Sequence, residues 1–461
     1  MTESDHTRST RSDGKALRSS VPRSSHAVWV PHEGRPNPVR TITNQNADRI
    51  QWLVPVRHWR MSESPFTFYR GAAAIMAEDL AQTPTSGITV QICGDAHLSN
   101  FGAYGSPDRE LVFDLNDFDE TLPGPWEWDV KRLAASFSIA ARHNGLDRAA
   151  QAAFAVRVAT SYRKAMRDFA RVGYLDAWYS RLSVDDIYAL FADQLTKKEK
   201  KSGRKFSRKA RNRDSLHVLG KLAELNDGEY QIVADPPLLV PLRDFPTSTG
   251  PTSIRASLEA SFTAYFGSLP DHVEVLLRRF RFRDLALKVV GVGSVGTRCY
   301  IILLEGRDSE DPFFLQVKEA SRSVLENHLP ESRYASNGER VVAGQRVMHA
   351  ASDVFLGWEQ SETTGTHYYW RQLKDMKASP DIDSASPEGL YRFARVCGWI
   401  LARAHARSSR SEEIAGYLGT AKTFDHALGE FAVAYADQND ADFAAFVSAI
   451  ASGEIASAEH P

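Results

Sequence analysis

Cysteine is scarce in this chain of 461 residues: Cys93, Cys299 and Cys397 lie far apart, and their number is odd. This disfavours a framework of disulfides and fits a reducing cytoplasm. No cysteines or histidines have the spacing of a zinc site. The chain also lacks a run approaching the ~18 apolar residues that a membrane span needs. No apolar segment opens it, so we expect neither a membrane anchor nor a secretory signal.

The chain has no large excess of charge of either sign, since the formal net charge is −2. Net charge therefore argues neither for nor against a nucleic-acid partner. A hydrophobic content of 43% and a charged content of 25% are ordinary for a globular enzyme, and the length suffices for two lobes. The one strong basic run, residues 197–213, contains a single aromatic residue, Phe206. It is typical of a solvated helix face or loop, which disfavours nucleic acid.

A dense set of polar side chains lies within residues 93–120, at the ends of two apolar segments that predict strands, 88–92 and 111–113. The set consists of Asp95, His97, Asn100, Asp114, Asn116, Asp117, Asp119 and Glu120. Carboxylates this close repel one another unless a cation or a proton lies among them. Carboxylate and amide oxygens suit magnesium, so the segment predicts a magnesium site. The alternative is a solvated acidic loop with turn-forming Asp and Asn.

Residues 94–100, Gly-Asp-Ala-His-Leu-Ser-Asn, resemble the catalytic loop of aminoglycoside and choline kinases, Gly-Asp-x-His-x-x-Asn. An Asp-Phe-Asp at 117–119, a Gly-Pro at 124–125 and an aspartate at 129 follow in that family's order. The resemblance implies that Asp95 and His97 serve catalysis, with Asp95 accepting the proton of an acceptor hydroxyl. It assigns the metal to Asn100, Asp117 and Asp119. It also implies that the aspartate at 129 braces the loop, although a helix start explains an acid there equally well.

The pattern changes after a proline-rich segment, residues 234–253, and strands are predicted at 285–290, 299–304 and 313–318. Gly291, Gly293, Ser294 and Gly296 lie between the first two strands, and the third ends in Lys318. This order resembles the nucleotide-binding lobe of a protein kinase, in which a Gly-x-Gly-x-x-Gly turn covers the phosphates and the lysine pairs with them. The resemblance implies that these residues bind ATP. A dinucleotide site would need a helix directly after the glycines, whereas a strand pattern follows here.

Two predicted helices complete the resemblance. The helix at 334–352 could supply a carboxylate to Lys318, and both Glu339 and the preceding Glu326 are candidates. The helix at 387–407 carries an apolar face and ends near His405. Its last residues resemble the helix that directly precedes the catalytic loop in aminoglycoside kinases.

The elements stand in an unusual order, because the catalytic-loop motif precedes the glycine-rich lobe. We therefore expect an α+β fold of the protein-kinase-like, two-lobe type in circularly permuted order, with a small antiparallel β lobe and a large helical lobe. The expected divisions are a disordered tail at 1–44, a helical lobe with the catalytic and metal loops at 45–284, the β lobe at 285–378 and completing helices at 379–461. The permuted order makes a geometric prediction, namely that Lys318 faces Asp117 across one cleft.

The whole chain also resembles an uncharacterised bacterial family, domain of unknown function 2252, over roughly residues 45–455. The matching phrases are Ser-Pro-Phe at 64–66, Tyr-Arg-Gly at 69–71, the 93–120 segment, Gln-Val-Lys-Glu-Ala at 316–320, Gln-Arg-Val at 345–347, Ala-Arg-Ala-His-Ala-Arg-Ser at 402–408 and Tyr-Ala-Asp-Gln at 435–438. This resemblance implies no activity.

The leading hypothesis is an ATP- and Mg²⁺-dependent phosphotransferase acting on a hydroxyl of a small molecule or protein, with nucleotidyl transfer as a close variant. A metallophosphoesterase is the first alternative, but the chain has no Gly-Asn-His motif to supply further ligands. A non-catalytic nucleotide-binding module is the second. Arg70 could reach a phosphate with its guanidinium, but a structural ion pair is the favoured role. The acceptor and the oligomeric state are left open.

Overall fold

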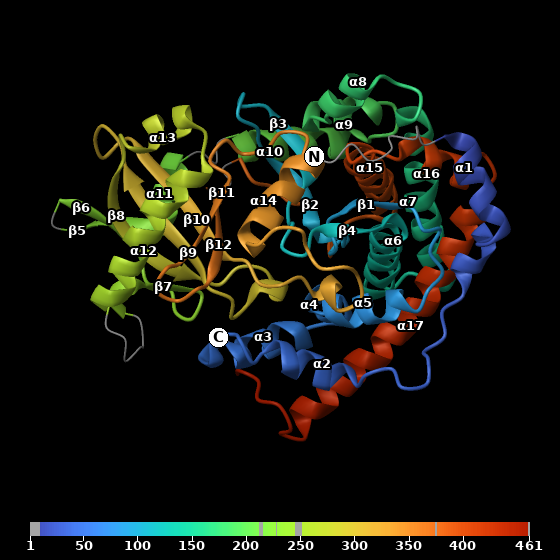
Figure 1. Cartoon of the computed structure of the whole chain (residues 1–461), viewed down its shortest axis with the longest axis horizontal. Helices are drawn as coiled ribbons and strands as arrows, with labels where there is room; N and C mark the ends of the chain where they lie inside the picture. The colour runs from blue at the N-terminus through green and yellow to red at the C-terminus, as the bar shows by residue number, and fades with distance from the viewer. Residues whose placement is uncertain (1–9, 212–214, 227, 245–250, 374–375, 460–461) are drawn as a thin grey trace.

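A computed structural model describes residues 10–211, 215–226, 228–244, 251–373 and 376–459. The fold is mixed α+β. Figure 1 shows a six-stranded sheet on one side of the molecule and most of the long helices on the other. The sheet is antiparallel, in the order β11-β12-β10-β9-β8-β7. Its strands are β7 (Leu239–Pro241), β8 (Arg281–Lys288), β9 (Cys299–Glu305), β10 (Pro312–Glu319), β11 (Gly357–Gln360) and β12 (His367–Gln372).

Both faces of this sheet are partly covered by helices. One face packs on α12 (Pro251–Tyr265) and α13 (Asp271–Leu277), where the rings of Tyr265 and Trp370 stack with centroids 4.8 Å apart. The other face is covered at its far end by α11 (Ser215–Leu222) and the hairpin of β5 (Ala223–Asn226) and β6 (Glu229–Ile232). Its near end faces the large helical part of the molecule, and the functional cleft lies there.

The sheet extends beyond the predicted β segment of 285–378. β8 begins at Arg281, and β7 joins its edge from within the proline-rich segment, with Leu239 opposite Lys288. Leu239 and Val240 are buried, so their apolar side chains gain more by covering the sheet than by remaining in a linker. Residues 245–250 of that segment lie outside the described part.

The helical part combines segments from both ends of the chain. Its first helices are α3 (Val54–Ser62), α4 (Pro65–Gly71) and α5 (Ala73–Ala81). Its centre consists of α6 (Trp126–His143) and α7 (Arg148–Phe169), against which α15 (Pro387–Ala406), α16 (Ser411–Leu418) and α17 (Thr423–Ala451) pack. Residues 126–141 are buried all round, which is typical of a helix at the core of a large domain. The shorter helices α8 (Tyr174–Tyr179), α9 (Val184–Leu190) and α10 (Lys197–Arg211) follow α7.

Two short ribbons and one helix connect the sheet with this helical part. β1 (Thr89–Ile92) pairs with β4 (Leu122–Pro125), and β2 (Phe101–Gly105) pairs with β3 (Leu111–Leu115). α14 (Asn337–Met348), inside the predicted helix 334–352, lies between the sheet and these ribbons in Figure 1. The functional cleft is therefore bounded by segments that are far apart in sequence.

The prediction of a disordered tail at 1–44 does not hold for residues 10–44. α1 (Arg11–Ala16) packs on α16, α2 (Pro38–Gln45) packs on α17, and Arg35 pairs with both Asp79 and Asp442. A composition rich in Ser, Arg and Pro predicts disorder only if the segment cannot bury its groups elsewhere. Here the helical part supplies those partners. Residues 1–9 lie outside the described part.

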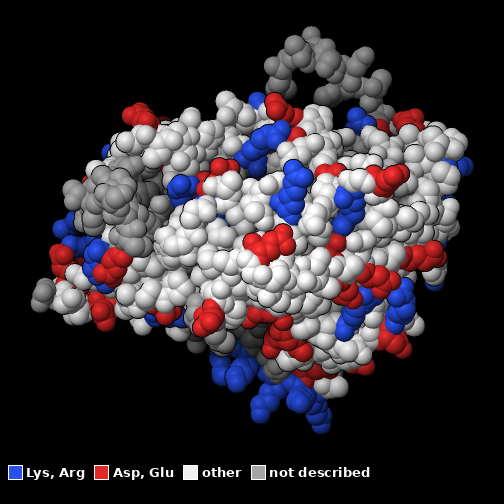
Figure 2. Space-filling view, turned by 90° about the horizontal axis from the view of Figure 1, so that it is seen from below, with Lys and Arg blue, Asp and Glu red and all other residues white. Residues whose placement is uncertain are grey.

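Charged side chains of both signs are mixed over the face shown in Figure 2, with one group of Lys and Arg at its lower margin. The basic run forms α10 over residues 197–211, as the solvated-helix interpretation predicts, and the rest of the run, residues 212–213, lies outside the described part. None of the helices in the described part combines the length and the apolar composition that crossing a bilayer requires.

We predict that Glu359→Gln stabilises the protein at high pH. Glu359, on β11, is 4% exposed, and burial raises its pKa to about 7. The fold therefore prefers the protonated side chain. The stabilisation of the fold by the protonated Glu359 side chain is complete below the ordinary glutamate pKa of about 4.3. This stabilisation is lost as the pH rises through about 7.

Denaturant unfolding should show equal stability of Glu359→Gln and wild type near pH 4, and a gain of about 1–3 kcal/mol for the variant at pH 8. The exposed Glu362→Gln serves as the control and should show no such difference. A gain that is the same at both pH values would contradict the prediction.

Candidate functional site

The cleft between the sheet and the helical part contains two adjoining hollows, of about 950 Å³ and about 260 Å³. Both are lined by Arg70, Asn100, Asp117, Gly291 and Ser294, which therefore mark their junction. The larger hollow extends along the sheet to Lys318 and Arg371. Volumes of this size are ordinary for a small-molecule or cofactor site.

The 93–100 loop starts where β1 ends and is held from behind by Asp129, in the first turn of α6. Its carboxylate accepts hydrogen bonds from the backbone N–H groups of Cys93, at 2.8 Å, and Gly94, at 2.9 Å. Gly94 has φ +80°, a left-handed conformation that favours glycine. His405, near the end of α15, lies 3.2 Å from the same carboxylate and 2.8 Å from the hydroxyl of Tyr162. The predicted brace and the predicted position of the His405 helix beneath the loop are thus both present.

Asp95 points into the smaller hollow and is paired with Arg132. The Nε of Arg132 donates to Oδ1 of Asp95 at 2.6 Å, while Oδ2 of Asp95 lies 3.8 Å from Nε2 of His97. Burial raises the pKa of Asp95, and the charge of Arg132 opposes this rise. One carboxylate oxygen is therefore neutralised, and the other is available to a proton donor in the hollow. His97 also lines this hollow, and burial lowers its pKa well below the usual value, so its imidazole is neutral.

Asn100 and Asp117 lie at the junction of the hollows. The side-chain amide of Asn100 donates to the backbone carbonyl of Asp95 at 2.7 Å, which leaves its oxygen as an acceptor. Asp117 follows β3, and its Oδ1 lies 3.5 Å from Nζ of Lys318. The geometric prediction that Lys318 faces Asp117 is therefore confirmed, although β10 and β3 are separated by much of the chain.

Lys318 makes its closest ion pair with Asp119. Its Nζ lies 2.6 Å from Oδ2 of Asp119, and the hydroxyl of Tyr369 donates to Oδ1 at 2.5 Å. Burial and the neighbouring Asp117 raise the pKa of Asp119, whereas Lys318 lowers it. The two carboxylates raise the pKa of Lys318 well above its usual value even though burial opposes this. The lysine and the two acids thus neutralise one another in a largely buried cluster.

The donor set fits a magnesium ion only in part. No three His, Cys, Asp or Glu side chains of the described residues form a ready group for a metal. Magnesium, however, is commonly held by one or two carboxylates together with substrate phosphates and water. Asn100 and Asp117 can supply such a minimal set, since both line both hollows. The oxygens of Asp119 are already bonded to Lys318 and Tyr369, so its predicted role as a ligand requires these bonds to exchange.

The glycine-rich turn closes the junction from the sheet side. It connects β8 and β9, which pair as predicted, through a short 3₁₀ turn at Val292–Ser294. Arg49 donates to the carbonyl of Gly293 at 3.0 Å and also to that of Val295. Gly291 and Ser294 line both hollows and Gly293 lines the smaller one, whereas Gly296, with φ +88°, lines neither and shapes the turn.

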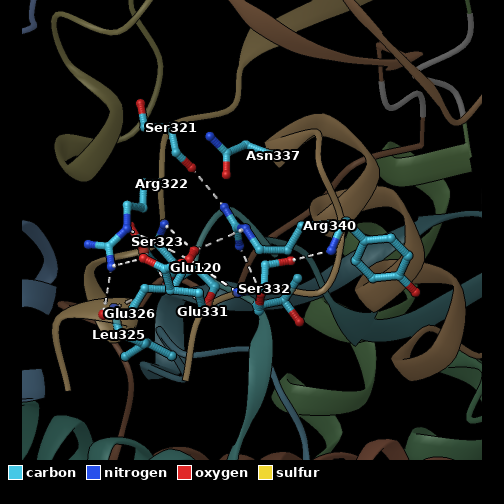
Figure 3. Close-up of polar contacts among 12 residues, drawn as sticks. Glu120, Ser321, Arg322, Ser323, Leu325, Glu326, Glu331, Ser332, Asn337 and Arg340 are labelled. Atoms are coloured by element: carbon cyan, nitrogen blue, oxygen red, sulfur yellow. Dashed lines mark hydrogen bonds and ion pairs between the residues drawn. The ribbon is translucent and has the colours of Figure 1, made fainter. Parts of the chain in front are cut away.

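The predicted glutamate partner of Lys318 is wrong. Within the described residues, Lys318 forms ion pairs with Asp117 and Asp119 but with neither Glu339 nor Glu326. Glu326 instead accepts from the backbone N–H groups of Ser323 at 3.1 Å and Ser332 at 3.2 Å (Figure 3). Glu339 lines neither hollow. Asp117 and Asp119 lie within ion-pair distance of Lys318 on β10, and the helical periodicity that predicts α14 could not reveal this.

Arg340 is an important residue that the sequence reasoning missed. Its guanidinium donates to the carbonyls of Asp119 at 2.9 Å, Thr121 at 2.7 Å and Ser321 at 2.8 Å. Figure 3 shows Arg340 beside the segment that follows β10. Ser323 of this segment donates a hydrogen bond to Glu120. α14 thereby holds the Asp-Phe-Asp segment by its backbone. No sequence signal distinguishes Arg340 from a surface arginine, because its burial results from the tertiary contact.

Further cations lie in the cleft, and of these only Arg70 was considered from the sequence as a phosphate contact. Arg70 lies at the junction and forms no ion pair with a described residue, and its buried Nε has no hydrogen-bond partner among them. The larger hollow is also lined by Lys221, Lys288, Arg371 and Lys377. The cleft therefore places a surplus of positive charge beside its acidic junction, which suits an anionic ligand.

Comparison with known proteins identifies the family of the chain. A family model described as "Uncharacterized protein conserved in bacteria (DUF2252)" matches residues 49–449, so the chain belongs to this family. No curated protein and no solved structure matches it. The family description assigns no activity, and a functional conclusion must come from the cleft.

We predict that Asp129→Ala destabilises the protein by about 2–4 kcal/mol, because it leaves two buried N–H donors without an acceptor. Asp129 is 1% exposed, and no other hydrogen bond replaces its contacts with the 93–100 loop. Denaturant unfolding measures the loss. The exposed Asp168→Ala on α7 is the control and should change stability by less than about 0.5 kcal/mol. A loss equal to that of the control would show that the loop does not depend on this brace.

Proposed function

We propose that this protein is an ATP- and Mg²⁺-dependent phosphotransferase with a kinase-like site assembled in permuted order, acting on a hydroxyl acceptor. The observation that carries the proposal is the meeting of Lys318 with Asp117 and Asp119 beside Asn100, Asp95 and the glycine-rich turn. Lys318 and Asp119 are 199 residues apart in sequence. Phosphoryl-group transfer requires a phosphate clamp, a metal site and a base around one phosphate, and this cleft supplies residues for each.

The order of elements around the cleft supports the kinase-like reading. β8, the glycine-rich turn, β9 and β10 with Lys318 are followed by α14, β11 and β12. After them, α15 ends beneath the 93–100 loop, although this loop stands near the start of the chain. In a kinase of ordinary order the same helix leads directly into that loop. A circular permutation that places the termini between them accounts for both facts.

Each proposed role follows from a position in the cleft. Asp95 would accept the proton of the acceptor hydroxyl through Oδ2, since Arg132 occupies Oδ1. Lys318 would move from Asp119 to the nucleotide phosphates. The N–H groups of the glycine-rich turn would cover them.

Asn100 and Asp117 would hold Mg²⁺, with Asp119 joining them once Lys318 has moved. The ion supplies neutralisation of the charge on the phosphates. His97, neutral and buried, would position the carboxylate of Asp95 and the loop around it.

The alternatives differ in what they require of the cleft. A two-metal phosphoesterase needs several converging His, Asp and Asn ligands, and the described residues contain no such group of acids and histidines. A non-catalytic module would bind a nucleotide without needing Asp95. Nucleotidyl transfer uses the same residues on a shifted nucleotide.

We predict that ATP with Mg²⁺ raises the thermal unfolding temperature of the protein and that Lys318→Ala reduces this effect. A ligand at 100 times its Kd adds about 2.7 kcal/mol of stability. The control is Lys164→Ala, an exposed lysine on α7 that lines neither hollow. Absence of any shift with saturating ATP and Mg²⁺ would remove both the transferase and the binding-module proposals.

We predict that Asp95→Asn retains the ATP-induced shift and lowers turnover by at least about 10²-fold, the typical contribution of a general base. The amide can still accept from Arg132, but the buried pair is weakened, so the folded fraction is measured alongside. Turnover is followed as consumption of ATP in the presence of an acceptor panel. Undiminished turnover by a folded Asp95→Asn protein would exclude Asp95 as the base.

A further inference from the structure

The sheet side of the larger hollow carries several basic side chains beside the apolar Val290 and Leu373. Gln316 and Lys318 point to the same face of β10, because they are two residues apart. Arg371 stands opposite Gln316 on β12, and its Nε donates to Oε1 of Gln316 at 3.0 Å. Lys288, at the end of β8, lines the same hollow.

These cations have few negative partners. Among the described residues, Lys221, Lys288 and Arg371 form no ion pair, and Arg371 is only 8% exposed. Burial lowers the pKa of Lys288; Cys299 opposes this shift, and the nearby Lys221 adds to it. Lys221, Lys288 and Arg371 line one hollow without a carboxylate of the described residues at ion-pair distance, which indicates a site for an anion with several charges.

A nucleobase would meet charged groups over part of this wall, although Val290 and Leu373 line the same hollow. Base-binding pockets are predominantly apolar, with a few polar groups that fix orientation. Here Gln316, Lys288 and Arg371 line the wall next to Lys318. A guanidinium and two ammonium groups instead match the oxygens of a phosphate chain.

The proposed base lies on the other side of the junction. Asp95 and His97 line the smaller hollow and not the larger one, whereas Lys318 and Arg371 line only the larger. A displacement at phosphorus places the attacking and leaving oxygens in line. With the attacking hydroxyl beside Asp95 and the reacting phosphorus at the junction, the leaving group extends into the basic hollow.

We propose that this leaving group is pyrophosphate: the nucleotide places its β- and γ-phosphates against Lys288, Arg371 and Lys377, and the protein transfers a nucleotidyl group to its acceptor. This rests on the nucleotide-binding cleft of the proposed function and takes up its nucleotidyl-transfer variant, in which the α-phosphorus reacts instead of the γ-phosphorus. The nucleoside then extends past the glycine-rich turn towards the smaller hollow.

The step balances without a further reagent. The acceptor oxygen forms a bond to the α-phosphorus, and the bond from that phosphorus to the oxygen bridging to the β-phosphate breaks. Its electron pair leaves with pyrophosphate, and the hydroxyl proton goes to Oδ2 of Asp95. Arg70, the cation at the junction, faces the charge on the α-phosphate during the transfer.

The first test determines which phosphorus of ATP is transferred. The full chain is incubated with Mg²⁺ and ATP labelled at either the α- or the γ-phosphorus, with a panel of hydroxyl acceptors and the protein itself as acceptor. We expect α-label on the acceptor and γ-label in pyrophosphate. Transfer of γ-label with formation of ADP would overturn this inference while leaving the proposed phosphotransferase intact.

The second test needs no acceptor. Calorimetry with magnesium pyrophosphate as the probe should show binding to the wild type, and Lys288→Met should weaken both this binding and that of ATP by at least 10-fold. Lys164→Met is the matched control and should bind both as the wild type does. ATP binding that is independent of Lys288, or no binding of pyrophosphate, overturns the orientation. No binding of ATP at all overturns the proposed function as well.

Discussion

The buried ion pair of Lys318 with Asp119 and Asp117 is the interaction on which the functional cleft depends. It joins the sheet to the segment after β3, and hence the two parts of the molecule. Removing an ammonium group from water costs several kcal/mol unless the protein supplies opposite charge and hydrogen bonds. Asp119 and Asp117 supply the opposite charge here, and the hydroxyl of Tyr369 donates to Asp119. Two acids share one lysine in this cluster. Phosphates that enter the cleft could compete with these acids for the lysine.

Other buried charges hold the site in position around this pair. Arg340 binds the carbonyl of Asp119, and Asp129 fixes the N–H groups at the start of the 93–100 loop. Arg403 on α15 pairs with Asp114 on β3, whose other oxygen accepts from the backbone of Ala350 at 2.9 Å. Each of these contacts connects segments distant in sequence. Loss of one partner leaves a buried charge or donor unsatisfied, which makes the arrangement rigid.

Much of the local structure was predictable. Helical periodicity identified α15, and alternation with β-branched residues identified β9 and β10. The motif at 94–100 identified the loop that lines the cleft with Asp95, His97 and Asn100, and the resemblance to kinases suggested where Asp129 and His405 would lie. Residues 10–44 were misjudged because their composition says nothing about the partners that α16 and α17 offer them. β7 was missed because a strand of three residues becomes stable only beside β8.

The sequence by itself determined which residue types could carry chemistry: Asp95, Asn100 and Asp117 follow strands in one short span, and Lys318 ends another strand. These are local properties of spacing and pattern. Only the tertiary structure decided that Lys318 pairs with Asp119 instead of a glutamate of α14, and that Arg371 and Lys288 line the same hollow. The physical reason is that electrostatic pairing depends on distance in space and on burial. Packing of the two parts against each other sets both, and sequence separation does not encode them.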